Sequence, residues 1–346
     1  MNIVFRVDSS NLIGSGHLMR CLTLATQQRK LGNDIVFICR DLDGNLSDLV
    51  NEKGFKVELL PKVKHNDNLD GYAQWLTVTQ EQDAFETINI LKRYKHIDRA
   101  VVDSYAIDET WEKMIRPYTD EIFVIDDLAN RKHDCDVLLD QNYYFDKEIR
   151  YNGLVPADCK LLLGPRYALL RQEFYYARQG MNPRSSYLHN ILVFYGGVDA
   201  TDETSKAIAA LDSLKENGEL DDVSVTVVVG DSNSRKETIA DSCCKAGFKY
   251  LCQVSNMAQL MAEADLMLGA GGTTTWERCY LGLPAIVTAV AENQYQICED
   301  CSTVGLFYYL GHWDVVTRDN IYEAVIIMKN PNTLLNMQKA IGRIFA

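Results

Sequence analysis

The chain has 346 residues, which is long for one ordinary α/β domain and comfortable for two domains that each bury a core. Hydrophobic residues make up 47% and charged residues 24%, which is typical of a soluble globular protein and excludes extensive disorder. The net charge of -13 argues against nucleic acid as a partner, because no dense run of Lys and Arg opposes it. The sequence shows no secretory leader and no apolar run of membrane-spanning length, so we expect a cytoplasmic protein without membrane insertion.

Short apolar or β-branched runs alternate with segments of helical period, which predicts parallel sheets flanked by helices. The predicted strands of the first half are 3–7, 35–39, 56–60, 100–103, 122–125, 137–139 and 161–163. Those of the second half are 191–195, 224–229, 250–252, 265–268 and 285–288. The polar and aromatic segment 166–184 separates the two series, so we predict α/β domains over 1–175 and 176–346. The wholly helical pattern after Thr317 suits a tail that packs across both domains.

Ten cysteines are distributed through the chain, mostly in apolar segments where reduced thiols pack as small hydrophobic groups. Those for which we expect such packing are Cys21, Cys39, Cys252 and Cys279. Cys298 and Cys301 form a C-x-x-C pair, but a structural zinc site would normally need a second such pair. Their spacing in a predicted helix places both thiols on one face, so we predict core packing and no metal.

The loop at residues 13–17 follows the first predicted strand and precedes a predicted helix that Gly32 ends. Gly14 and Gly16, with Ser15 between them, allow close backbone approach to a ligand, and the helix N-terminus offers unpaired N–H groups to an anion. Met19 replaces the third glycine of the dinucleotide fingerprint, which argues against NAD or FAD. We predict no cofactor.

His17 ends this loop, at a junction where open α/β sheets bind ligands. Imidazole exchanges a proton near neutral pH, so His17 is a candidate general base. A histidine that only caps or packs at the start of the helix fits the position equally well.

Two glycine-rich loops in the second half are candidates for binding phosphate or ribose. In the first, Thr274 and Glu277 have the spacing of a capping box, and Glu277 could serve the cap alone. The other candidates in that loop are Gly271, Gly272 and Thr273. The second loop carries Gly196 and Gly197, which a simple turn would also use. Together with the loop at 13–17, they predict a ligand cleft between the two domains.

Polar residues follow two further predicted strands. Asp103 and Tyr105 lie at the end of one, and Asn293 and Gln294 follow the other. Their side chains could orient sugar hydroxyl and acetamido groups, or they could mark turns. The Asp126-Asp127 pair lacks a nearby histidine or third carboxylate, so we favour a solvated loop or a hydrogen-bonding role over a metal site.

Four segments carry a family resemblance: RVDSSNLIGSGHLMRCLTLA, VVDSY, VFYGGVDATDET and ADLMLGAGGTTTWERCYLGLPAIVTAVAENQ. With them the chain resembles the UDP-2,4-diacetamido-2,4,6-trideoxy-β-L-altropyranose hydrolases of pseudaminic acid biosynthesis. More distantly, the glycine-rich loops are similar to those of UDP-sugar glycosyltransferases of GT-B fold. The resemblance implies two Rossmann-like domains facing across a cleft, with UDP held mainly by the C-terminal domain.

The resemblance also assigns roles to single residues. His17 matches the catalytic histidine, and Glu277 would bind the uridine ribose. The backbones of Gly196, Gly197 and 271–274 would bind the diphosphate. Residues implied to contact the sugar or to belong to the N-terminal signature are Arg6, Asp8, Gly14, Ser15, Gly16, Asp103, Tyr105, Asn293 and Gln294.

The implied reaction is inverting hydrolysis between the anomeric carbon and its oxygen, by water that His17 activates, with UDP as leaving group and no metal. One alternative is a glycosyltransferase of the same fold that uses a hydroxyl acceptor. Another is a non-catalytic UDP-sugar-binding protein. We expect a monomer or weak oligomer, and the stretch 60–90 matches no motif.

Overall fold

The computed structural model describes residues 1–63 and 69–345 and divides into two compact units. The first unit comprises Met1–Asn142 and Asp146–Leu169, and the second comprises Tyr143–Phe145 and Leu170–Ala346. The main division, between Leu169 and Leu170, lies inside the polar segment 166–184. Each unit is built on its own parallel sheet.

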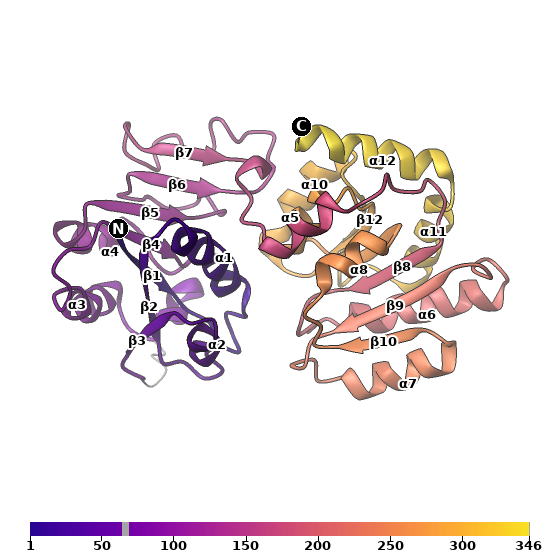
Figure 1. The fold of residues 1–346 in the computed structure, drawn as a ribbon, viewed down its shortest axis with the longest axis horizontal. Coiled ribbons are helices and arrows are strands. Elements are labelled where there is room, and N and C mark those ends of the chain that lie inside the picture. The colour runs from indigo at the N-terminus through magenta and orange to yellow at the C-terminus, as the bar shows by residue number, and fades with distance from the viewer. Residues whose placement is uncertain (64–68, 346) are drawn as a thin grey trace. The chain divides into compact units, whose positions relative to one another are not determined.

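The described residues of the first unit form a seven-stranded sheet in the order β3-β2-β1-β4-β5-β6-β7, and every neighbouring pair is parallel (Figure 1). The strands are β1 Asn2–Val7, β2 Asp34–Arg40, β3 Lys56–Leu60, β4 Arg99–Asp103, β5 Glu121–Ile125, β6 Val137–Asp140 and β7 Lys160–Leu163. All seven strands predicted in the first half are confirmed.

Helices cover both faces of this sheet, which is why its inner strands are almost continuously apolar. Phe5 and Val7 of β1 pack on one face with Leu22 of helix α1, whereas Val4 packs on the other with Trp111 of helix α4. The helices are α1 Gly16–Lys30, α2 Ser47–Glu52, α3 Gln80–Leu91 and α4 Glu109–Ile115, with the 3-10 helices η1 Gly71–Leu76, η2 Arg116–Tyr118 and η3 Pro165–Tyr167. The predicted end of α1 is confirmed, because Gly32 follows it at φ +83.

The described residues of the second unit form a six-stranded parallel sheet in the order β10-β9-β8-β11-β12-β13. The strands are β8 Asn190–Phe194, β9 Ser224–Val229, β10 Lys249–Cys252, β11 Leu266–Ala270, β12 Ala285–Ala289 and β13 Tyr308–His312. The five strands predicted in the second half are confirmed, and β13 was missed. The fold class is therefore confirmed as two Rossmann-like α/β units.

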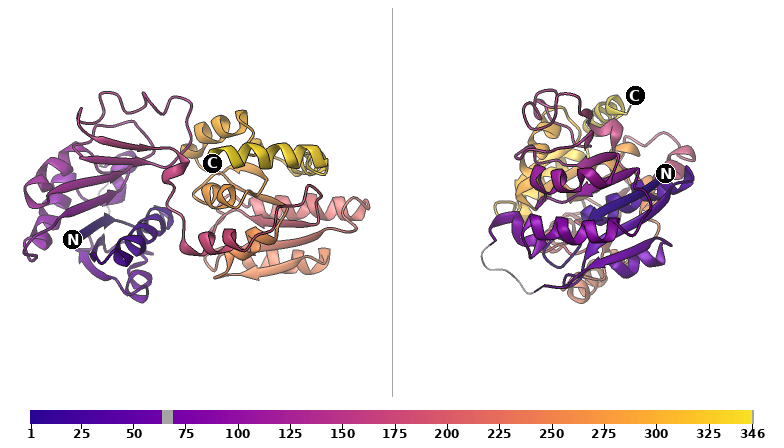
Figure 2. Two further views of the ribbon diagram at one scale, coloured as in Figure 1. Left: turned by 45° about the horizontal axis from the view of Figure 1, so that its top comes forward. Right: turned by 90° about the vertical axis from the view of Figure 1, so that its left-hand side faces the viewer.

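Helices again surround the second sheet. They are α5 Gln172–Gln179, α6 Glu203–Glu216, α7 Lys236–Ala246, α8 Met257–Glu263, α9 Thr274–Tyr280, α10 Tyr295–Thr303, α11 Arg318–Met328 and α12 Pro331–Ile344, with the 3-10 helix η4 Glu292–Gln294. The helical pattern predicted after Thr317 is confirmed, and α12 packs within this unit against α9 and α11. Figure 2 shows α12 as the yellow helix next to the C-terminus. In the described part of the chain, no helix combines the length and apolar character needed to cross a membrane.

The cysteines follow the predicted packing with one exception. Cys298 and Cys301 lie fully buried on α10, as predicted. Cys21, Cys39 and Cys279 are also buried, as predicted. Cys252 is exposed, so the prediction of core packing is wrong there. The reason is that Cys252 ends β10, which is an edge strand of its sheet.

Candidate functional site

The carboxyl ends of β1 and β4 form the switch point of the first sheet. These strands are neighbours, and the chain leaves β1 toward β2 on one side and β4 toward β5 on the other. Ligands of open α/β sheets bind in the crevice outside such a switch point. His17 lies on the helix that follows β1, and Asp103 is the last residue of β4. The topology therefore brings these two predicted site residues together.

His17 and Asp103 form a buried hydrogen-bonded pair. Nδ1 of His17 lies 2.6 Å from Oδ1 of Asp103. Because an ionised carboxylate only accepts hydrogen bonds, we assign the tautomer of His17 that carries its proton on Nδ1. Among the described residues, Nε2 of His17 has no hydrogen-bond partner, so this nitrogen is free to accept a proton.

Arg20 lies one turn after His17 on α1 and holds Asp103 in place. Its Nε and Nη2 donate to the two carboxylate oxygens of Asp103 over 2.6 and 2.7 Å, and its Nη1 donates to Asp127 over 2.8 Å. Burial opposes the ionisation of Asp103, but Arg20 and then His17 hold the pKa of Asp103 well below its usual range. Burial also disfavours the charged form of Arg20, but Asp103 and Asp127 raise the pKa of Arg20 above its usual value. Asp103 and Arg20 therefore stay charged at neutral pH.

Three aromatic rings form a wall beside His17. The ring of Tyr105 lies edge-on to the imidazole with centroids 4.5 Å apart, and that of Trp75 lies edge-on at 5.6 Å. Trp75 and Tyr105 stack at 5.4 Å, and Tyr72 contacts both rings. The hydroxyl of Tyr105 donates to Asp127 over 2.5 Å, which ties this aromatic wall to the polar network. Tyr72 is 36% exposed and presents the wall to solvent.

The rest of the loop before α1 is open. Gly14 adopts φ +78, and a Cβ there would meet no atom within 4 Å. Ser15 precedes α1 without capping it by its side chain, and both Ser15 and Gly16 are exposed. The first backbone N–H groups of α1 thus face no side-chain cap, which suits an anionic group of a ligand.

Arg6 and Asp8 belong to a buried polar network. Nη1 of Arg6 donates to Asp8 over 2.6 Å, while its Nε and Nη2 donate to Asp83 over 3.0 and 2.7 Å. The backbone N–H of Arg40 donates to Asp8 over 2.7 Å. Arg6 is 1% and Asp8 3% exposed, so these contacts favour a supporting role. Contact with a substrate stays a prediction for both.

The prediction for the Asp126-Asp127 pair is partly wrong. Asp126 is fully buried, and the hydroxyl of Tyr151 donates to it over 3.1 Å, so its hydrogen-bonding role is confirmed and a solvated loop is excluded there. A histidine and a third carboxylate do lie near Asp126 in the fold. Nε2 of His133 is 4.0 Å from Asp126, and the hydroxyl of Tyr151, which contacts Asp126, also contacts the carboxylate of Asp140.

The second sheet has its own switch point, between β8 and β11. Gly196 and Gly197 follow β8, and the loop 271–274 follows β11, so two predicted loops meet at one edge of the sheet. Gly196 adopts φ +103, a conformation that favours glycine. A Cβ at Gly196 or Gly197 would meet no atom within 4 Å, so this loop leaves room for a ligand.

Gly271 and Gly272 differ in why they are glycines. A Cβ at Gly271 would lie 2.2 Å from Sγ of Cys298, so packing alone requires glycine there. At Gly272 the nearest atom would be Nε2 of Gln294 at 3.5 Å, which is an ordinary contact. Gly272 is half-buried and the neighbouring Thr273 is exposed. These two are therefore the residues of this loop best placed to meet a ligand.

The predicted capping box at Thr274 and Glu277 is wrong. Helix α9 begins at Thr274 with Thr273 as its N-cap residue, and no side chain caps it. The carboxylate of Glu277 instead accepts two hydrogen bonds from Arg171, over 2.6 and 3.0 Å, and such a bidentate charged pair is stronger than a cap. Burial raises the pKa of Glu277, and Arg171 opposes that shift. Its contact with a ribose stays a prediction.

Asn293 and Gln294 lie on η4, which follows β12 at the same edge of the sheet. Oε1 of Gln294 accepts a hydrogen bond from the backbone N–H of Val290 over 3.0 Å, and its side chain lies beside Gly272. Asn293 is exposed. Gln294 thus links η4 to the loop after β11, and the roles of both amides toward a sugar stay predictions.

Known proteins resemble this chain in sequence and in fold. Residues 190–312 match the glycosyltransferase family 28 C-terminal domain. MurG of Acinetobacter baumannii superposes with a TM-score of 0.65 at 14% identity, over 99% of this chain and 94% of that chain. The fold of the chain is therefore GT-B-like.

Curated relatives confirm the resemblance found in the sequence. This GT-B-like chain is 31% identical to the UDP-2,4-diacetamido-2,4,6-trideoxy-beta-L-altropyranose hydrolase of Campylobacter jejuni over 199 residues. The aligned region covers 58% of this chain and 61% of the hydrolase. It is 28% identical over 313 residues to an uncharacterized protein of Methanocaldococcus jannaschii, which covers 87% of this chain and 58% of that protein. The chain thus spans about three fifths of the length of these two relatives.

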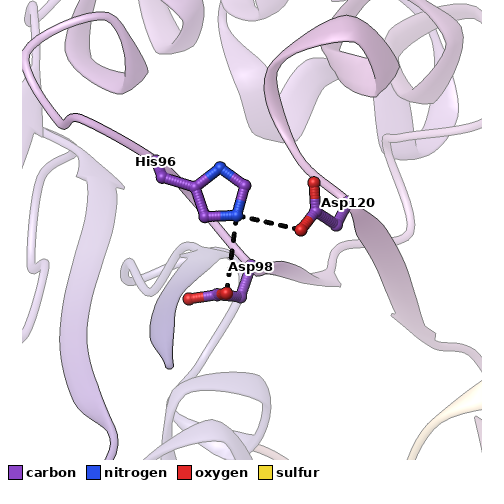
Figure 3. A group of neighbouring side chains, drawn as sticks. All are labelled: His96, Asp98 and Asp120. Atoms are coloured by element: carbon purple, nitrogen blue, oxygen red, sulfur yellow. Dashed lines mark hydrogen bonds and ion pairs between the residues drawn. The ribbon is translucent and has the colours of Figure 1, made fainter.

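One further group of side chains in this GT-B-like chain has the chemistry of metal ligands. Of the residues that the structure describes, only His96, Asp98 and Asp120 bring three such ligand atoms within 4.8 Å of one another (Figure 3). Nε2 of His96 lies 2.9 Å from Asp120 and 3.5 Å from Asp98. The group precedes β4 and β5, at the amino ends of the strands, opposite the edge that carries His17. Exposed ion pairs of this kind are common, and we assign it no part in the site.

Three residues of the first unit's site were not predicted from the sequence: Tyr72, Trp75 and Arg20. Tyr72 and Trp75 lie on η1, within the stretch 60–90 that no motif explained. Arg20 could have been found, since it follows His17 by three residues and a helix places such residues on one face.

Proposed function

We propose that this protein hydrolyses a UDP-linked 2,4-diacetamido-2,4,6-trideoxy sugar at the anomeric C–O bond, with inversion, and releases UDP and the free sugar. The product would serve pseudaminic acid biosynthesis. One observation carries this proposal: the His17–Asp103–Arg20 network leaves Nε2 of His17 free beside an aromatic wall at the sheet's switch point. The identity to the hydrolase of Campylobacter jejuni supports the choice of substrate.

In this mechanism Nε2 of His17 takes a proton from a water molecule whose oxygen attacks the anomeric carbon. The bond between that carbon and the phosphate oxygen breaks, and UDP leaves with the bonding electrons. The carboxylate of Asp103 orients the imidazole and stabilises the imidazolium that forms, while Arg20 keeps Asp103 ionised.

The remaining loops would bind the rest of the substrate. The backbone N–H groups at 196–197 and 271–274 would hold the diphosphate and stabilise the charge of the leaving group. The aromatic wall of Tyr72, Trp75 and Tyr105 would receive the sugar, whose acetamido methyl and 6-deoxy groups are apolar.

The match to the glycosyltransferase family 28 C-terminal domain favours a second candidate, transfer of the sugar to a hydroxyl acceptor. Incubation of the purified protein with the UDP-diacetamido-altrose in ¹⁸O-labelled water, without acceptor, separates the two. Label in the free sugar supports hydrolysis. Release of UDP only after a hydroxyl acceptor is added would favour the transferase, and label in UDP would refute cleavage at the anomeric carbon.

The His17→Ala variant tests whether the protein is an enzyme or only binds UDP-sugars. We expect turnover to fall by roughly two to four orders of magnitude, the usual contribution of a general base, while UDP still binds. Rates come from UDP release and affinities from calorimetric titration. Unchanged turnover would refute His17 as the base.

A further inference from the structure

Two cysteines meet at the amino ends of the last two strands of the first sheet. Cys135 lies just before β6 and Cys159 just before β7, and their sulfur atoms are 3.6 Å apart. The backbones are already paired at this level, because the N–H of Lys160 donates to the carbonyl of Asp136 over 2.8 Å.

The two thiols have different surroundings. Cys135 is 1% exposed and packs in the core that contains Trp111, whereas Cys159 is partly exposed at the surface of that core. The hydrogen bond between the two thiols lowers the pKa of Cys159 and raises that of Cys135. Burial and the nearby carboxylates of Asp136 and Asp158 oppose the shift at Cys159. Because Cys159 is the more exposed of the two thiols, reagents in solution reach it first. Its lowered pKa also makes it the better nucleophile at neutral pH.

We propose that Cys135 and Cys159 are a redox modification site, at which a small-molecule disulfide such as oxidised glutathione converts the two thiols into a reversible protein disulfide. The sulfur atoms must approach by roughly 1.5 Å to reach bonding distance, which small side-chain rotations at the starts of two adjacent strands can supply. The bond would join β6 to β7, which is an edge strand.

The reaction proceeds in two exchange steps. The thiolate of Cys159 attacks one sulfur of oxidised glutathione, forms a mixed disulfide and releases one glutathione thiolate. The thiol of Cys135 then loses its proton, attacks the sulfur of Cys159 and releases the second glutathione. Two protein thiols are oxidised, and one glutathione disulfide is reduced to two thiols. Disulfides of this transient kind are the ones found in reducing compartments.

The test uses the full chain, reduced, freed of reductant and incubated with oxidised glutathione at neutral pH. Digestion without reductant followed by mass spectrometry should yield one peptide pair linked through Cys135 and Cys159, with the loss of two of the ten free thiols. Dithiothreitol should restore both thiols.

Variants separate the two steps. In Cys135→Ser we expect glutathione to stay attached to Cys159, because no thiol resolves the mixed disulfide. In Cys159→Ser we expect no modification of Cys135. The matched control Cys244→Ser removes an exposed thiol elsewhere and should leave the cross-link intact. A chain that keeps Cys135 and Cys159 reduced while Cys244 is modified, or that links other pairs instead, would overturn the proposal.

Discussion

At the level of single residues, Asp103 joins two side chains of α1, since the imidazole of His17 and the guanidinium of Arg20 both bond its carboxylate. Replacement of Asp103 by Asn removes the negative charge that stabilises the imidazolium and offers an amide N–H to an imidazole nitrogen that should itself donate. We expect kcat for hydrolysis to fall by roughly two to four orders of magnitude with a small change in KM.

Steady-state kinetics measure this effect. Asp98→Asn is the matched control, because Asp98 is a partly exposed carboxylate that directly precedes the same strand, at the opposite edge of the sheet. A wild-type kcat in Asp103→Asn would contradict the role given to the carboxylate.

Asp140 is a second residue whose charge state the fold alters. Burial, and then the charge of Asp127, raises the pKa of Asp140 to about 8. In the unfolded chain the same carboxyl loses its proton at about pH 4. Between about pH 4 and about pH 8 the folded state therefore binds more protons than the unfolded state, and the free energy of unfolding falls as pH rises.

The Asp140→Asn variant removes this titration and keeps a neutral side chain that can still accept from the backbone N–H of Asn142. Relative to this variant, we expect the wild type to lose stability as pH rises from about 5 to about 8, by at most about 1.4 kcal/mol per pH unit. Urea unfolding across that range measures the difference. Parallel stability curves would show that Asp140 ionises normally in the folded protein.

At the level of elements, the glycine loop after β11 combines a packing role with the proposed role in binding the diphosphate. Gly271→Ala places a Cβ 2.2 Å from Sγ of Cys298, and we expect a loss of about 1–3 kcal/mol in the free energy of unfolding. Gly272→Ala meets only the flexible end of Gln294 at 3.5 Å and should fold with nearly wild-type stability.

Denaturant unfolding of the two variants side by side checks this contrast. Cys298→Ala added to Gly271→Ala should recover part of the loss, because it removes the atom that the new methyl group would meet. Equal stability of Gly271→Ala and Gly272→Ala would mean that α10 moves aside without cost.

The sequence predicted buried strands well, because runs such as Ile122–Ile125 are apolar on both faces, as a parallel sheet covered on both sides requires. It missed β13, an edge strand whose sequence Tyr308–His312 contains Gly311 and stays half-buried throughout. It also misjudged Glu277, because spacing within a helix cannot reveal an Arg171 that lies 106 residues away.

The candidate site divides in the same way. His17 and the glycines could be predicted because they share a local loop, and Asp103 because it ends a strand. The stretch 60–90 carried no local pattern of this kind, yet its Trp75 packs against His17 and its Asp83 bonds Arg6. Contacts between segments that are distant in the chain produce no local motif or regular spacing, so a single sequence does not predict them.

At the level of the whole molecule, two sheets of the same topological type each carry candidate loops at their switch point. The net charge of -13 cannot attract an anionic substrate, so binding must depend on local donors such as the exposed backbone of these loops. In the proposed function, the second unit binds UDP and the first performs the chemistry. Binding and turnover should therefore respond to different substitutions.

The double variant His17→Ala/Gly272→Asp tests this separation. The aspartate would place a negative charge beside the diphosphate, so we expect Gly272→Asp to raise Kd for UDP at least roughly tenfold. The neutral isostere Gly272→Asn is the matched control for size. Because His17 is proposed to act on water and sugar only, His17→Ala should keep the wild-type Kd, and the double variant should match Gly272→Asp. Calorimetric titration with UDP measures Kd for the four variants and the wild type. If His17→Ala raised Kd as much as Gly272→Asp does, UDP would have to contact the first unit as well.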